Sequence, residues 1–162
     1  IHDEGSLRPE LEPTPEMLRF LGEEVVAWAR ESYPITDDPK QTIIGGNRIG
    51  GGLAALVALE HPEVFGAVVI ESGDLSICPS DAEASAGPCV PRRFRDTPKA
   101  PLAFSIDVGI FEGEPVVETS RHLRDVLIAK GYEVRYRETP SNQSSIAWWE
   151  ALVRGLEASL AE

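Results

Sequence analysis

The sequence predicts an α/β fold: a three-layer sandwich in which a mostly parallel sheet carries helices on both faces. Short apolar stretches rich in β-branched residues alternate with longer stretches that have helical spacing. The connections between them are short and rich in glycine and proline. A chain of 162 residues, 42% of them apolar, can bury one core. We therefore expect a single domain over residues 1–162.

The N-terminal part predicts one long helix. Residues 1–13 are polar and interrupted by proline, which indicates an irregular lead-in. Thr14 then offers an N-cap, and Pro15 suits the first helical position. Apolar residues follow at three- and four-residue spacing, so we expect an amphipathic helix that ends near Ser32.

The centre of the chain predicts two strands around a buried helix. Residues 41–46 (QTIIGG) and 67–70 (AVVI) are short β-branched stretches typical of buried strands. Between them, residues 49–60 are apolar nearly all round, as in a helix inside a larger fold, and Pro62 stops it. The stretch from Cys78 to Cys89 is rich in Pro, Ser, Ala and Gly, which predicts a loop.

The C-terminal part continues the alternation. Residues 102–106 predict a third strand, and residues 116–130 predict a helix that Gly131 terminates. Residues 132–137 alternate in polarity and predict a fourth strand, and residues 146–160 predict the last helix. About four parallel strands follow from this pattern.

Charge and composition exclude several classes of partner. The formal charge of −12 repels phosphate backbones, so we expect no nucleic acid. No stretch approaches the roughly 18 apolar residues of a membrane-spanning helix, and the first residues lack the features of a signal peptide. We expect a soluble protein without a membrane partner, cytoplasmic rather than secreted.

The cysteines and histidines do not predict a metal site. Cys78 and Cys89 lie in one loop and could form a disulfide, or could remain two free thiols. His2, His61 and His122 are scattered, and no cluster has zinc spacing. We expect neither a metal nor another cofactor.

The glycine-rich segment TIIGGNRIGGGLAAL, residues 42–56, is the most informative motif. It reads as strand, tight turn and apolar helix, an arrangement that presents backbone N–H groups where oxyanions are held. A phosphate loop would need Lys and Ser/Thr where Gly51 and Gly52 stand, and Gly46 and Gly50 do not fit a dinucleotide fingerprint. The arrangement that remains is the nucleophile elbow of α/β-hydrolases, G-x-S-x-G.

Residues 37–73 (DDPKQTIIGGNRIGGGLAALVALEHPEVFGAVVIESG) resemble the elbow region of the enterochelin-esterase family, esterases of the esterase D type. Residues 8–13 resemble the family's R-x-E-L-x-P segment, and residues 101–113 and 122–138 resemble its later strands and helix. The similarity is interrupted only around residues 76–97. The resemblance implies the C-terminal half of an α/β-hydrolase fold without its N-terminal strands, and a family that cleaves carboxylic esters.

The residues at the catalytic positions of this family are changed. On G-x-S-x-G-G, the segment 46–51 puts Arg48 where the nucleophilic serine belongs, and a guanidinium cannot attack a carbonyl. The position that matches the catalytic histidine is Gln143. Asp107 and Glu112 are candidates for the acid, but an acid without a histidine has no triad role. We therefore expect no catalytic residue.

Two interpretations of Arg48 remain open. It could anchor a carboxylate or phosphate in a degenerate cleft, or it could fill that cleft and pair with Asp107, Glu112 or Glu71. Residues assigned to this cleft are Asn47, Arg48, Ile49, Asp107, Glu112 and Gln143.

The sequence thus predicts a catalytically degenerate relative of enterochelin-type esterases that binds a small anionic or ester ligand or a protein. The alternative is an active hydrolase of a siderophore-type or other small ester that uses an unrecognised nucleophile. Ser72 follows the second strand, and its family counterpart belongs to a structural turn.

The implied absence of N-terminal strands affects the expected partners. Gln41 to Gly45 would form an apolar edge strand with unpaired backbone groups. We expect either a homo-oligomer through this edge and the helix 14–32, or a second polypeptide that completes the sheet. Alternatively, residues 1–13 could cover the edge in a monomer.

Overall fold

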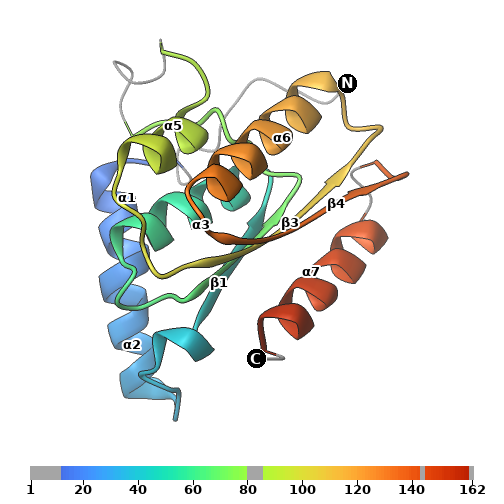
Figure 1. Cartoon of the computed structure of the whole chain (residues 1–162). Helices are drawn as coiled ribbons and strands as arrows, with labels where there is room; N and C mark the ends of the chain where they lie inside the picture. The colour runs from blue at the N-terminus through green and yellow to red at the C-terminus, as the bar shows by residue number, and fades with distance from the viewer. Residues whose placement is uncertain (1–11, 80–85, 143–144, 161–162) are drawn as a thin grey trace.

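The computed structural model describes residues 12–79, 86–142 and 145–160. Its sheet has four parallel strands in the order β1-β2-β3-β4, with helices on both faces, as Figure 1 shows. The strands are β1 (Ile43–Asn47), β2 (Ala67–Glu71), β3 (Ala103–Gly109) and β4 (Glu133–Thr139). The predicted α/β class is confirmed, and each predicted strand lies at its expected place.

The helices divide unequally between the two faces of the sheet. α3, α5 and α6 cover one face, with the N-terminal helix packed on α3, and α7 lies on the other (Figure 1). Their bounds are α1 (Pro15–Arg19), η2 (Phe20–Glu24), α2 (Val25–Ser32), η3 (Pro39–Gln41), α3 (Ile49–Glu60), α5 (Cys89–Asp96), α6 (Glu114–Ala129) and α7 (Ser145–Leu160). None of the described helices has the length and apolar character needed to cross a membrane.

The N-terminal helix begins as predicted but contains a wider turn. The Thr14 hydroxyl accepts the Met17 N–H at 3.2 Å, and Pro15 takes the first position. We expected an uninterrupted α-helix through Ser32, whereas η2 is a π-helical turn that separates α1 from α2. Within η2, Gly22 lies against the ring of His61, and a Cβ atom at this position would overlap that ring. The π-helical turn therefore lies where the helix contacts His61, and the apolar spacing of residues 14–32 does not predict this contact.

The core is centred on α3. All residues from Gly51 to Leu59 are buried, which explains why this helix is apolar all round. Phe94 from α5 meets Phe104 and Tyr132 edge to face, with ring centroids 5.3 and 5.9 Å away. The sequence assigned no helix to residues 76–97, but α5 packs there through its buried residues.

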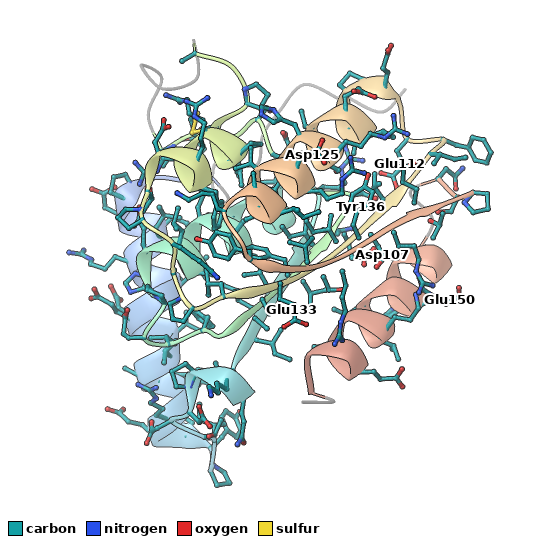
Figure 2. The ribbon with its side chains drawn as sticks, in the orientation of Figure 1. Asp107, Glu112, Asp125, Glu133, Tyr136 and Glu150 are labelled. Atoms are coloured by element: carbon teal, nitrogen blue, oxygen red, sulfur yellow. A yellow bond between two sulfur atoms is a disulfide. The ribbon has the colours of Figure 1, made fainter. Side chains whose placement is uncertain are left out.

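A disulfide ties α5 to the segment that follows β2. Cys78 and Cys89 are bonded, with their Cα atoms 5.3 Å apart, and the bond is drawn in yellow in Figure 2. The N–H of Val90 donates to the carbonyl of Leu75 at 3.1 Å. The covalent bond and this hydrogen bond hold the same two segments together.

We predict that reduction of this disulfide lowers the stability of the fold. Loop closure over 11 residues of separation contributes about 3 kcal/mol in the chain-entropy description. Thermal unfolding with and without a dithiol reductant measures the loss. The Cys78→Ala variant is the control, because its unfolding should not respond to reductant. Equal unfolding temperatures for the oxidised and reduced wild type would contradict the prediction.

Candidate ligand site at the elbow between β1 and α3

The chain turns sharply at Arg48, between the end of β1 and the start of α3. Arg48 has φ 51° and ψ −123°, a backbone conformation that costs a non-glycine residue free energy. Its N–H donates to the carbonyl of Glu71 at 3.1 Å, and its carbonyl accepts the N–H of Asp74 at 2.8 Å. These bonds to the end of β2 and the segment after it hold the turn. Its side chain is exposed.

Glycine is required on both sides of this turn by close backbone contacts. A Cβ atom on Gly46 would overlap the backbone of Gly50, the second residue of α3. A Cβ atom on Gly52 would overlap the carbonyl oxygen of Asp74. Glycines thus let the helix start directly above the strand end, which is the geometry of a nucleophile elbow.

A row of polar side chains crosses the sheet beside the elbow. Asn47, Glu71, Asp107 and Arg137 are lateral neighbours on β1, β2, β3 and β4, so their side chains lie on the same face. This is the face that α7 covers. Arg154 of α7 approaches Asp107 with Nη2 3.5 Å from Oδ1, and Arg137 approaches the same oxygen at 3.9 Å. Figure 2 shows Asp107 between the sheet and α7.

Burial raises the pKa of two carboxyl groups in this row. Glu71 is only 6% exposed, and its Oε1 has no hydrogen-bond partner among the described residues. Burial, followed by the negative charge of Asp107, raises the pKa of Glu71 to about 8. Burial also raises the pKa of Asp107, although Arg154 and Arg137 oppose that shift. At neutral pH the row therefore contains a protonated Glu71.

A second hydrogen-bonded pair lies next to the row. Ser72 has φ 45°, and its hydroxyl donates to Oε1 of Glu112 at 2.5 Å. The same carboxylate oxygen accepts the N–H of Gly109 at 3.3 Å. The Ser72 N–H donates to the carbonyl of Asp107 at 2.8 Å. The loop after β3 is thus fixed to the end of β2.

The structure brings most of the candidate cleft residues to one end of the sheet. Asn47, Arg48 and Ile49 form the elbow, and Asp107 lies in the polar row. Glu112 follows β3 and bonds Ser72. The sixth residue, Gln143, lies outside the described residues.

Sequence reasoning missed one member of the site and undervalued another. The sequence pattern indicates no role for Arg154, and its spacing of four residues from Glu150 on α7 is the one local signal that it offers. The sequence predicts Glu71 only as a partner for Arg48, although a glutamate that ends an apolar strand is an unusual buried residue.

The histidines of the described chain lie away from the elbow. His61 follows the last residue of α3, at the end opposite Arg48, and contacts Glu63 at 3.3 Å. His122 belongs to α6. Within the described residues, no group of three or more His, Cys, Asp or Glu side chains could hold a metal ion.

A groove of about 840 Å³ lies at the opposite end of the sheet. Its lining includes Lys40, Gly66, Lys99 and Gly131, which adjoin the amino ends of the strands. The groove is therefore separate from Arg48 and its neighbours.

We predict that backbone strain at Arg48 can be relieved by glycine. Arg48→Gly and Arg48→Ala both remove the side chain, but only glycine adopts positive φ without a steric cost. The glycine variant should be more stable than the alanine variant by about 1 kcal/mol or more. Chemical denaturation of the two variants measures the difference, and equal stabilities would contradict strain at this turn.

We predict that Glu71 makes the protein less stable as the pH rises. The folded protein keeps a proton that the unfolded chain releases, between the ordinary pKa of 4.5 and the raised pKa of about 8. Stability should therefore fall across this window, by at most about 1.4 kcal/mol per pH unit, and Glu71→Gln should remove the decline. Urea denaturation at several pH values measures it.

The matched control for this experiment is Glu138→Gln. Arg121 lowers the pKa of Glu138 to about 2 in the folded protein, and the unfolded chain ionises this group above its ordinary pKa of 4.5, so its loss leaves the decline through the upper part of the window unchanged. A Glu71→Gln variant that declines as steeply as the wild type would contradict the assignment.

The fold and parts of the sequence match known esterases. The "Iron(III) enterobactin esterase" of Dickeya dadantii is 25% identical over 142 residues, which cover 82% of this chain and 32% of the relative. The enterobactin esterase of Shigella flexneri, crystallised with 2,3-di-hydroxy-N-benzoyl-glycine, matches with a TM-score of 0.81 and 19% identity over 94% of this chain and 40% of that one. The ferric enterobactin esterase of Salmonella typhimurium matches with a TM-score of 0.79 and 22% identity, over 94% of this chain and 38% of that one.

The chain spans between about a third and two fifths of the length of these relatives. A family model described as "Putative esterase" matches residues 3–158, nearly the whole chain. These matches agree with the elbow, the parallel sheet and the helix order described above. The chain belongs to this esterase family.

Proposed function

We propose that this chain is a catalytically degenerate member of its esterase family, which binds a small anionic or ester ligand at the elbow without hydrolysing it. The observation that carries the proposal is Arg48 at the apex of a turn with elbow geometry. A guanidinium is permanently protonated and cannot act as a nucleophile. It is well suited to bind a carboxylate or phosphate through two parallel hydrogen bonds.

The surroundings of the elbow also favour binding over hydrolysis. Serine hydrolysis needs a general base within hydrogen-bond reach of the nucleophile. The two described histidines lie on α6 and at the far end of α3. By its resemblance, the position of the catalytic histidine holds Gln143, which neither accepts nor releases a proton at ordinary pH.

The relatives suggest the chemistry of the ligand. One of the Shigella flexneri crystal structures was obtained in the presence of 2,3-di-hydroxy-N-benzoyl-serine, a benzoylated amino acid that carries a carboxylate. A cation at the N-terminus of α3, next to backbone N–H groups, suits such a carboxylate. We therefore choose this molecule as the probe.

Thermal stabilisation and turnover test the proposal together. The wild type should be stabilised by 2,3-di-hydroxy-N-benzoyl-serine, should not turn over an activated aryl ester, and should not react with a fluorophosphonate. Arg48→Ala should abolish the stabilisation. Arg95→Ala is the control, because Arg95 is an exposed arginine on α5 that pairs with Asp96. Ester turnover at ordinary enzyme rates by the wild type would disprove the proposal.

We further predict that hydrolysis needs both changed positions to be restored. Losing a triad member costs up to about a million-fold in turnover, so Arg48→Ser alone should gain little. Arg48→Ser combined with Gln143→His is the minimal rescue. Turnover of an activated aryl ester measures it, and full activity in the single variant would contradict the assignment of Gln143.

A second candidate function is hydrolysis through Ser72. This serine has positive φ, adjoins the elbow, and donates a hydrogen bond of 2.5 Å to Glu112. A carboxylate that close can accept a proton from the hydroxyl, although it is a weaker base than imidazole. If the wild type does hydrolyse esters, Ser72→Ala should abolish that activity and Arg48→Ala should not.

A further inference from the structure

The segment that follows β2, residues 73–78, lies against the elbow. The N–H of Asp74 donates to the carbonyl of Arg48 at 2.8 Å. The segment also touches the first turn of α3, because a Cβ atom on Gly52 would overlap the carbonyl oxygen of Asp74 and crowd the side chain of Ile77. One side of the turn at Arg48 is therefore held by this segment.

The same segment is held to α5 at its other end. The disulfide joins Cys78 to Cys89, the first residue of α5. Between Cys78 and the elbow the chain forms a compact turn, in which the carboxylate of Asp74 accepts the N–H and the hydroxyl of Ser76 at 3.1 and 2.6 Å. The covalent bond at Cys78 thus positions a short, internally bonded turn, and that turn bonds Arg48.

The backbone conformation of Arg48 depends on such support. Its φ of 51° costs free energy, and a strained conformation of this kind persists only where the surrounding contacts enforce it. The bond from its N–H to Glu71 belongs to the end of β2 and does not depend on the disulfide. The bond from Asp74 to its carbonyl depends on the position of residues 73–78. Release of this segment would remove one of these two bonds and let the turn relax.

The surroundings of the two sulfur atoms favour thiol–disulfide exchange. Cys78 is partly exposed, whereas Cys89 is wholly buried. Nη2 of Arg92 lies 3.7 Å from Sγ of Cys78 and 3.6 Å from Sγ of Cys89. This guanidinium and the N-terminus of α5 both stabilise negative charge on Sγ of Cys89, so Cys89 is the better leaving group. The exposed sulfur is thus the one that a thiolate attacks, and the buried sulfur is the one that leaves.

We propose that the Cys78–Cys89 disulfide is a redox switch that controls the conformation of the elbow. A thiolate of a dithiol reductant bonds to Sγ of Cys78, and the bond between the two cysteines breaks with its electron pair on Sγ of Cys89. The second thiol of the reductant loses its proton and attacks its partner sulfur, which releases Cys78 as a thiolate. The protein disulfide gains two electrons, the dithiol becomes a cyclic disulfide, and its two protons pass to the cysteines or to water.

The two redox states differ in what holds residues 73–78. In the oxidised state the segment supports Arg48, and in the reduced state it opens away from the elbow. As regulation of ligand binding, the switch rests on the function proposed above, since a relaxed turn no longer aims the Arg48 side chain and the N–H groups of α3 at one ligand. The opening of the segment needs no ligand, so the two proposals can fail separately.

Hydrogen exchange of the chain, oxidised or reduced with dithiothreitol, tests the switch. The reference is the amide of Ile106, which is buried at the centre of the sheet. A general loss of stability raises the exchange rates of Asp74 and Ile106 by the same factor, whereas opening of residues 73–78 exposes only Asp74. Reduction should therefore raise the ratio of the Asp74 rate to the Ile106 rate about tenfold or more. An unchanged ratio would overturn the proposal.

The matched variant is Cys78→Ala, which cannot form the bond. Its ratio of the Asp74 rate to the Ile106 rate should be raised with and without dithiothreitol. A ratio equal to that of the oxidised wild type would overturn the proposal, because the variant lacks the disulfide without any reductant being present.

The rate of reduction tests the role of Arg92, with alkylation and mass measurement to count the released thiols. Arg92→Gln should slow thiol release by dithiothreitol about threefold or more, whereas Arg92→Lys keeps the charge and should keep most of the rate. Arg95→Gln is the control, because Arg95 is an exposed residue of the same helix that pairs with Asp96. Equal rates for Arg92→Gln and the wild type would overturn the exchange step.

Ligand binding is measured separately in the two redox states. The probe 2,3-di-hydroxy-N-benzoyl-serine should raise the unfolding temperature of the oxidised protein more than that of the reduced protein. Equal stabilisation of both states would overturn regulation of the site. Stabilisation of neither state would disprove the proposed function, while the exchange ratio would still decide the switch.

Discussion

The close approach of α3 to the carboxyl ends of β1 and β2 governs most of this structure. It requires glycine where the helix backbone passes the strand and the segment after β2. It also forces Arg48 into a backbone conformation that hydrogen bonds to Glu71 and Asp74 hold. The same approach buries α3 almost completely, so the helix that forms the core is also the helix that positions the elbow. The stability of the fold and the geometry of the candidate site therefore both depend on the contact between α3 and the ends of β1 and β2.

On the face of the sheet that α7 covers, the constraint is the burial of carboxyl groups. Carboxyl groups at the ends of β2 and β3 are covered by a helix, and a buried charge without compensation is costly. Glu71 avoids this cost by keeping its proton, and Asp107 is compensated by two arginines. Gly155 lets α7 lie close to the sheet, which brings Arg154 to this row. The docking of α7 thus both covers the polar row and brings the arginine that neutralises Asp107.

The sequence predicted what depends on local pattern. Period and composition located the four strands, and the spacing of glycines around Arg48 located the elbow. α5 was missed because Pro91 and its basic residues give a weak helical pattern, and its place depends on a disulfide and on aromatic contacts distant in sequence. The pairing of Arg154 with Asp107 depends on how α7 docks, 47 residues further along the chain. No local propensity encodes such contacts.

The π-helical turn of the N-terminal helix determines where this segment can change in length. A π-helical turn holds about one residue more than an α-helical turn, so deleting one residue within Phe20–Glu24 would restore regular α-helical turns and leave the flanking segments facing the core. A one-residue deletion within α2 has a different effect, because an α-helix advances 100° per residue and everything before the deletion would rotate by that angle. Leu18, which is wholly buried, would then turn away from the core. Other insertions and deletions are better tolerated in the segment between Tyr33 and Asp38, which is largely exposed and precedes the sheet.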